Sequence, residues 1–228
     1  MMNRGNFVRS SLGAAAALAG LPYAALAAEE AAPVRYPSAE ALALLAAGNK
    51  RFAGGASLKV DHTARRVTLT SGQNPFAIVL ACADSRVAPE VIFDQGLGDL
   101  FVVRVAGNFA DADGIGSIEY AVSHFGSSVL LVLGHSGCGA VHATVDLLKS
   151  GGTAPGDIQS IVTALTPAAK AAMSEPGDAY VNCIRENVKR NVAKLQAQKP
   201  IIAEAVEKGR LRVSGGVYDL ASGLVSML

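Results

Sequence analysis

The sequence predicts an α/β protein with a three-layer α/β/α architecture and a mostly parallel central sheet. Three short apolar runs indicate strands, at residues 76–81, 100–105 and 129–133. They do not alternate between apolar and polar positions, which is typical of strands buried on both faces beneath helices. Helical patterns lie between and after the runs, and such alternation favours a parallel sheet. We expect about four parallel strands plus an antiparallel edge strand.

The remaining elements are predicted from local signals. Ser38 is placed to cap a first helix that Gly48 would end, and the polar stretch from there to Pro75 is interpreted as extended surface chain. Apolar periodicity predicts further helices and a closing hairpin. The helices span residues 115–124, 140–148 and 179–196, and the hairpin strands span 210–218 and 224–228.

Composition narrows the classes of function. The chain has 228 residues, 50% of them hydrophobic, and a net charge of +1. One domain with a substantial core is therefore expected. The sequence has no long basic or acidic run, which argues against binding to nucleic acid, since that usually needs a basic face. Three cysteines are too few, and odd in number, for a disulfide scaffold.

The first 27 residues resemble a bacterial export signal. Arg4 and Arg9 precede an apolar stretch that is too short for a comfortable membrane span. Ala25-Leu26-Ala27 then provides a cleavage site of the small-x-small kind. We expect a signal peptide at residues 1–27 and a mature domain at 28–228, periplasmic or otherwise exported and without a membrane span.

The sequence does not assign the export route. Residues 3–9 resemble a twin-arginine motif, but Gly5 stands where the second arginine would be. The alternative to a signal is a disordered or helical N-terminal extension.

Two segments that carry metal-ligand side chains follow the first and third apolar runs. They are Cys82-Ala83-Asp84-Ser85-Arg86 and Gly134-His135-Ser136-Gly137-Cys138-Gly139-Ala140. In a parallel sheet both lie at the carboxyl edge, where open α/β sheets bind ligands. Two thiolates with one imidazole favour zinc over magnesium or calcium. The alternatives are cysteines that only pack in the core, and a disulfide between Cys82 and Cys138.

Together the two segments closely resemble the signature of the β-carbonic anhydrases. The resemblance extends through residues 93–104 and 116–121 and resumes at 211–224, so it covers nearly all of the chain from Ser38 onward. It implies a zinc lyase that reversibly hydrates carbon dioxide to bicarbonate and a proton through hydroxide on zinc, with one Zn²⁺ per chain. It also implies a homodimer, or an assembly of dimers, that shares pocket residues across the interface.

The same resemblance assigns roles to individual residues. Cys82, His135 and Cys138 would be the permanent zinc ligands. Asp84 would either take the fourth zinc position or turn to Arg86, which can hold it in a two-pronged, charge-assisted pair. The substrate-binding pocket would be lined by Gln73, Phe101, Ala106, Tyr120 and Gly139.

Two departures refine this expectation. The chain has no Trp and retains Gln73, which favours the subgroup with an open, water-bound site over the subgroup that closes its zinc with Asp. Ala106 falls where a valine often narrows the pocket. Two alternative functions stay open: a carbon disulfide hydrolase on the same scaffold, and a non-catalytic zinc or bicarbonate binder with Asp84 permanently on the metal.

Overall fold

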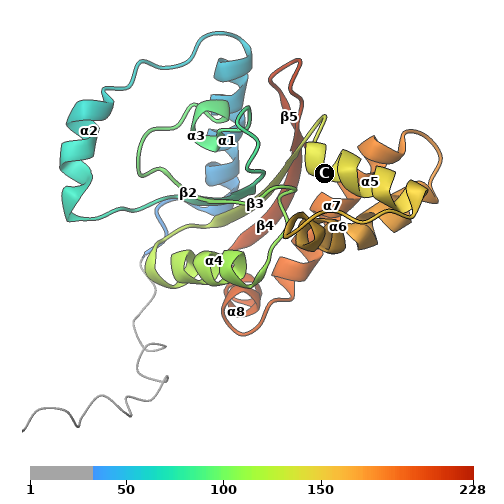
Figure 1. The fold of residues 1–228 in the computed structure, drawn as a ribbon. Coiled ribbons are helices and arrows are strands. Elements are labelled where there is room, and N and C mark those ends of the chain that lie inside the picture. Colours follow the sequence, from blue (N-terminus) through green and yellow to red (C-terminus); the bar gives the residue numbers. More distant parts are fainter. Residues whose placement is uncertain (1–32) are drawn as a thin grey trace, which may run out of the picture. The chain divides into compact units, whose positions relative to one another are not determined.

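The computed structural model describes residues 33–228, in which five strands form one sheet of order β2-β1-β3-β4-β5 (Figure 1). The first four strands are parallel, and β5 is antiparallel to β4. Their bounds are β1 (Ala77–Ala81), β2 (Leu100–Arg104), β3 (Val129–His135), β4 (Arg212–Tyr218) and β5 (Val225–Met227). The predicted mostly parallel sheet, its antiparallel edge strand and the closing hairpin are confirmed. The predicted signal peptide lies outside the described residues.

Helices cover both faces of this sheet (Figure 1). They are α1 (Ser38–Ala53), α2 (His62–Thr68), α3 (Pro89–Ile92), α4 (Ala112–His124), α5 (Gly139–Ser150), α6 (Ile158–Met173), α7 (Ala179–Gln196) and α8 (Ile201–Glu207), with a short 3₁₀ turn, η2 (Leu69–Ser71). Val79 and Leu131 pack with α1 and α3 on one face. Ile78 and Leu130 pack with α4, α7 and α8 on the other. The predicted three layers follow from this alternation along the strands.

The predicted end of the first helix at Gly48 is wrong, because α1 continues to Ala53. A Cβ atom on Gly48 would lie 1.8 Å from the carbonyl oxygen of Phe93. Glycine at this position therefore allows α1 to approach the end of α3 closely, and does not mark a helix terminus. The predicted cap is also wrong: Pro37 precedes the first turn, and no side chain caps it.

The stretch after α1 is not extended throughout, as the sequence had suggested, but contains α2. Asp61 caps this helix by accepting hydrogen bonds from the backbone N–H groups of Thr63 and Ala64. Arg65 of α2 then pairs with Asp99 just before β2, at 2.6 Å. Local capping and one ion pair thus tie a segment with little apolar character to the loop before β2.

The later helices at 115–124, 140–148 and 179–196 are confirmed within a few residues at each end. The short helix α3 and the helices α6 and α8 were not predicted. Among residues 33–228, no helix combines the length and apolarity needed to cross a bilayer.

Candidate metal centre

The sheet register brings the two predicted ligand segments together. β1 and β3 are neighbours, and Ala81 lies opposite Leu133. Cys82 therefore leaves β1 beside the end of β3, which is His135. Cys138 follows after a turn in which Gly137 has a φ of 64°, and it stands at the N-cap of α5. The ligand atoms of Cys82, His135 and Cys138 lie within 4.8 Å of one another, and all three residues are buried.

His135 is oriented as a metal ligand would be. Its Nδ1 lies 3.0 Å from the carbonyl oxygen of Ser136. Since a carbonyl oxygen only accepts, Nδ1 carries the hydrogen and Nε2 keeps its lone pair. The buried Nε2 has no hydrogen-bond partner among the described residues. An unpaired buried nitrogen is costly unless a ligand satisfies it, and two sulfurs with one imidazole nitrogen match a tetrahedral zinc site with an open position.

The two thiols of this group differ in acidity. The pKa of the Cys82 thiol is lowered, mainly by a hydrogen bond from the Cys138 thiol and further by the Gly107 N–H. The pKa of Cys138 is raised, by that same hydrogen bond and by burial. The first of the two thiol protons is therefore lost from Cys82. Binding of a metal cation would release the second proton, from Cys138. All three cysteines of the chain are free, so the structure does not show the alternative disulfide.

Asp84 is held by Arg86 and is not inserted among the three ligand atoms. Arg86 reaches Asp84 with both its side chain and its backbone N–H, the latter 2.9 Å from Oδ1. These hydrogen bonds hold the pKa of the Asp84 carboxyl well below its usual range. Oδ2 of Asp84 lies 4.0 Å from Nε2 of His135. The carboxylate is therefore ionised and near the candidate ligands, but its hydrogen bonds are to Arg86.

Arg104 supports this segment from the neighbouring strand, a role that sequence reasoning missed. It ends β2, and its guanidinium donates to the carbonyl oxygens of Cys82 at 3.0 Å and Asp84 at 2.7 Å. The available signal was its place at the carboxyl end of a strand next to β1. A second missed residue is Asn108, which is 2% exposed and whose Nδ2 has no partner in the described part of the chain.

The predicted pocket residues fall into two groups. Ala106 directly precedes Gly107, whose N–H lies 3.3 Å from Cys82 Sγ, and Gly139 directly follows Cys138. Phe101 instead pairs with Ile78, four residues before Cys82. At 3.3 Å per strand residue, that is roughly 13 Å from the metal group along the sheet.

Like Phe101, Tyr120 and Gln73 lie away from the metal group of their own chain. Tyr120 lies on α4 and is 52% exposed, and both Tyr120 and Phe101 contact Phe125, with ring centroids 5.7 Å apart in each case. Gln73 is exposed in the chain that precedes β1. Within one chain, the structure does not bring these three residues to the metal group.

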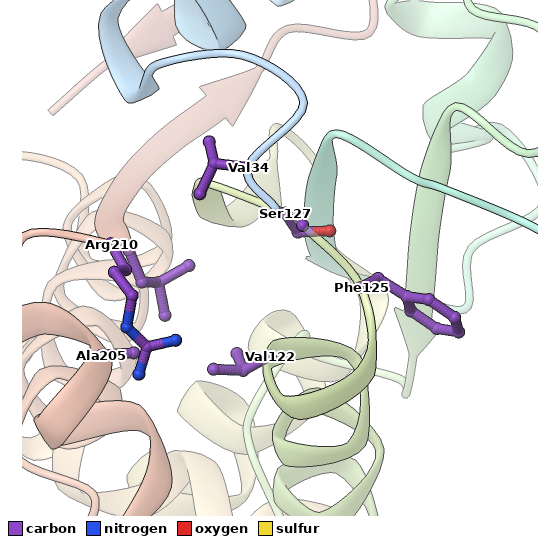
Figure 2. A pocket seen from close by; sticks show the side chains of 8 residues that line it. Val34, Val122, Phe125, Ser127, Ala205 and Arg210 are labelled. Carbon is purple, nitrogen blue, oxygen red and sulfur yellow. The ribbon is translucent and has the colours of Figure 1, made fainter. Parts of the chain in front are cut away.

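Two hollows in the described part of the chain are lined by none of the predicted site residues. Figure 2 shows a small pocket of about 20 Å³ whose lining includes Val34, Val122, Phe125, Ser127, Ala205 and Arg210. It has room for little more than a water molecule. A larger cavity, about 290 Å³, is lined by His142 and Tyr180, whose rings stack at 4.2 Å. The His142 imidazole, one helical turn past Cys138 in the sequence, is thus stacked on the Tyr180 ring.

A family model described as "Carbonic anhydrase" matches residues 77–225. The solved β-carbonic anhydrase of Coccomyxa, determined with acetazolamide, superposes with a TM-score of 0.64 at 26% identity, covering 86% of this chain and 87% of that one. This chain belongs to the β-carbonic anhydrase family. The predicted fold and family are confirmed together.

Other members of the family resemble this β-carbonic anhydrase over most of their length. The carbonic anhydrase of Mycolicibacterium smegmatis is 41% identical over 185 residues, which is 79% of this chain and 88% of the relative. A tetrameric β-carbonic anhydrase of Sordaria macrospora has a TM-score of 0.64 at 25% identity, covering 80% of this chain and 93% of that one. The family match over residues 77–225 includes the four parallel strands and both ligand segments.

Proposed function

We propose that this β-carbonic anhydrase catalyses the reversible hydration of carbon dioxide with one zinc ion per chain, held by Cys82, His135 and Cys138. The observation that carries the proposal is the buried group of two sulfurs and an imidazole whose Nε2 has no partner. Relatives named carbonic anhydrase, at up to 41% identity, support the activity. Neither a carbon disulfide hydrolase nor a non-catalytic binder is favoured by these relatives.

The residues around the metal group have separate tasks. Zinc, when bound, supplies a Lewis acid that makes water a competent nucleophile near neutral pH. Ser136 fixes the tautomer of His135, so that Nε2 is free to bind. Arg104 holds the backbone of Cys82 and Asp84 in place. Arg86 keeps the Asp84 carboxylate away from the ligand atoms, which corresponds to the open form of the site.

The substrate pocket is completed by a second chain in this proposal. Ala106 and Gly139 lie beside the metal group of their own chain, whereas Gln73, Phe101 and Tyr120 do not. Phe101 and Tyr120 lie at the β2 edge of the sheet, which is open to another molecule in the single chain. A homodimer, or an assembly of dimers, would place these aromatic side chains and Gln73 on a partner's site. The tetrameric Sordaria macrospora enzymes are consistent with such assembly.

We also propose that residues 1–27 are an export signal and that the mature enzyme acts in the periplasm. The support is the layout of the sequence: Arg4 and Arg9, a short apolar stretch and a cleavage site at Ala25-Leu26-Ala27. N-terminal sequencing of enzyme recovered from the periplasmic fraction would test this. A chain that keeps Met1 and stays in the cytoplasm would contradict it.

The central experiment measures zinc content and stopped-flow hydration of carbon dioxide at mildly alkaline pH, on the mature chain from Ala28. We expect one zinc per chain and rapid hydration, both lost in Cys138→Ala. Cys183→Ala is the matched control, because Cys183 is equally buried but lies in α7 and is not part of the group of ligand atoms.

Other results would redirect the assignment. Stoichiometric zinc without hydration would favour the closed binder or a different substrate. Absence of zinc, with two thiols missing from a titration, would show that Cys82 and Cys138 form a disulfide instead.

A further inference from the structure

The loop that joins β2 to α4 is fastened to α7 by three polar side chains. Asn187 Nδ2 donates to the carbonyl oxygen of Gly107 at 2.8 Å. Asn191 Oδ1 accepts from the backbone N–H of Ala110 at 2.9 Å, and Lys194 donates to the Ala110 carbonyl at 2.6 Å. These residues lie along one side of α7, at spacings of four and three. A helix distant in sequence thus holds both ends of a four-residue segment.

The side-chain amides of Asn187 and Asn191 are buried, and each of their nitrogen and oxygen atoms has a hydrogen-bond partner. Asn187 and Asn191 are 2% and 6% exposed. Asn191 Nδ2 donates to Asn187 Oδ1 at 3.0 Å, so the Asn187 amide must turn its own Nδ2 toward Gly107. Burying two amides inside a core is costly unless each is hydrogen-bonded. The network meets this condition and leaves Asn187 a single orientation.

Gly107 connects this network to the metal centre. Its carbonyl accepts from Asn187, while its N–H lies 3.3 Å from Cys82 Sγ. The φ of Gly107 is 85°, a left-handed conformation that glycine adopts readily. A Cβ here would also lie 2.9 Å from Leu165 Cδ1. The backbone of Gly107 therefore transmits the position of Asn187 to the N–H···S hydrogen bond.

We propose that Asn187, supported by Asn191, is a positioning residue of the metal centre, which fixes Gly107 so that its N–H hydrogen-bonds to Cys82 Sγ. An N–H donor draws electron density from a ligand sulfur, and partners outside the ligand set tune a metal in this way. A sulfur so engaged gives less charge to the metal and leaves it a stronger Lewis acid. The inference rests on the proposed function only in that Cys82 binds a metal.

The test replaces zinc by cobalt(II), whose sulfur-to-metal charge-transfer absorption reports on the ligand sulfurs without any turnover. In Asn187→Leu, a neutral change of similar volume, the Cys82 sulfur loses its hydrogen bond and becomes a better donor. We expect the charge-transfer band to move to longer wavelength. In the zinc enzyme, we expect kcat to fall about tenfold, the lower end of such effects, with a smaller change in KM.

Two further variants separate positioning from general damage. Leu195→Ala is the matched control: Leu195 is fully buried on the same helix but packs among apolar side chains on the sheet. It should lower the melting temperature without moving the cobalt band. Asn191→Ala removes the support behind Asn187 and the hydrogen bond to the Ala110 N–H but leaves Asn187 itself, and should shift the band in the same direction by less. It remains informative if Asn187→Leu does not fold.

Failure of this inference can be told apart from failure of the proposed function. Wild-type protein that binds cobalt, with the same band in Asn187→Leu and Asn191→Ala, would overturn the inference alone. An equal shift in Leu195→Ala would also overturn it, because the effect would then be general loosening of α7. Wild-type protein that binds neither cobalt nor zinc would overturn both.

Discussion

Arg86 holds both carboxylate oxygens of Asp84, with Nε 3.0 Å from Oδ1 and Nη2 2.8 Å from Oδ2. The Asp84 side chain is 17% exposed and that of Arg86 is 58% exposed. The Asp84 side chain is therefore mostly buried, with Oδ2 4.0 Å from His135 Nε2, while Arg86 reaches solvent. The pair holds the Asp84 carboxylate toward Arg86, and we propose that it thereby keeps the metal site open.

Removing the guanidinium should close the site. In Arg86→Leu, Asp84 loses its two-pronged partner and its ionised carboxylate is free to bind the metal. We expect hydration activity at neutral pH to fall by about 10- to 100-fold, as for other partners of metal-site residues, while zinc content is unchanged. Stopped-flow assays with metal analysis would measure both quantities.

Arg86→Lys is the control for charge alone. Lysine keeps the positive charge but cannot form the two-pronged pair, so we expect activity between those of wild type and Arg86→Leu. Full activity in Arg86→Leu would show that the pair has no part in opening the site.

The lowered pKa of Asp84 also predicts how stability depends on pH. A carboxyl whose pKa is lower in the folded state contributes stability above its unfolded pKa of about 3.9, and loses it as pH falls through the folded pKa. We therefore expect the difference in melting temperature between wild type and Asp84→Asn to be constant from neutral pH down to about pH 5. Below about pH 4 the difference should shrink.

This comparison is best made on metal-free protein, so that metal binding does not contribute to the melting temperature. Because Arg86 is largely exposed, added salt should reduce the difference. A difference that vanished between neutral pH and pH 5 would show that Arg86 does not lower the pKa of Asp84.

A pocket shared between chains predicts complementation between two defective variants. Cys82→Ala removes a metal ligand, and Gln73→Ala removes a residue that the proposal places on the partner's site. In a mixed dimer one site has both defects and the other has neither. If equal amounts are refolded together, random pairing into symmetric dimers should restore about a quarter of wild-type activity.

Each variant refolded alone is the control, since it has no intact site. Activity of the mixture no higher than the mean of the two parents would show that Gln73 acts in its own chain or outside the pocket. A fully active monomer in sedimentation would equally contradict the shared pocket.

Local patterns in the sequence predicted the buried strands and the two ligand segments, and the family resemblance assigned the ligands. Apolar runs predicted β1, β2 and β3, and the candidate ligands lie at or just after the ends of β1 and β3. The chemistry of Cys82, His135 and Cys138 is local to two short segments, and only the pairing of β1 with β3 is needed to join them. The sequence left that pairing open, and the strand order β2-β1-β3 of the folded sheet supplies it.

What the sequence did not reveal depends on contacts between distant segments. Helix α6 contains Pro167, which interrupts the helical signal, yet it packs its apolar side against the core. Asn187 resembles any polar residue of an amphipathic helix. Only the folded chain shows it buried against Gly107, 80 positions away. Gly48 was misinterpreted for the same reason, because a close approach by Phe93 leaves no mark on neighbouring residues.

Gly48 provides a test of the packing between α1 and α3. Adding one methyl group in Gly48→Ala would place Cβ 1.8 Å from the carbonyl oxygen of Phe93, a backbone atom that cannot swing aside. We expect the free energy of unfolding to fall by about 3 kcal/mol, the upper end of what overpacking usually costs. Urea denaturation at fixed protein concentration would measure it. Ala47→Ser is the control, because Ala47 is exposed on the adjacent position of α1 and its change should cost only a few tenths of a kcal/mol. If Gly48→Ala were as stable as Ala47→Ser, α1 would have to lie farther from Phe93 than the structure places it, and glycine would be dispensable there.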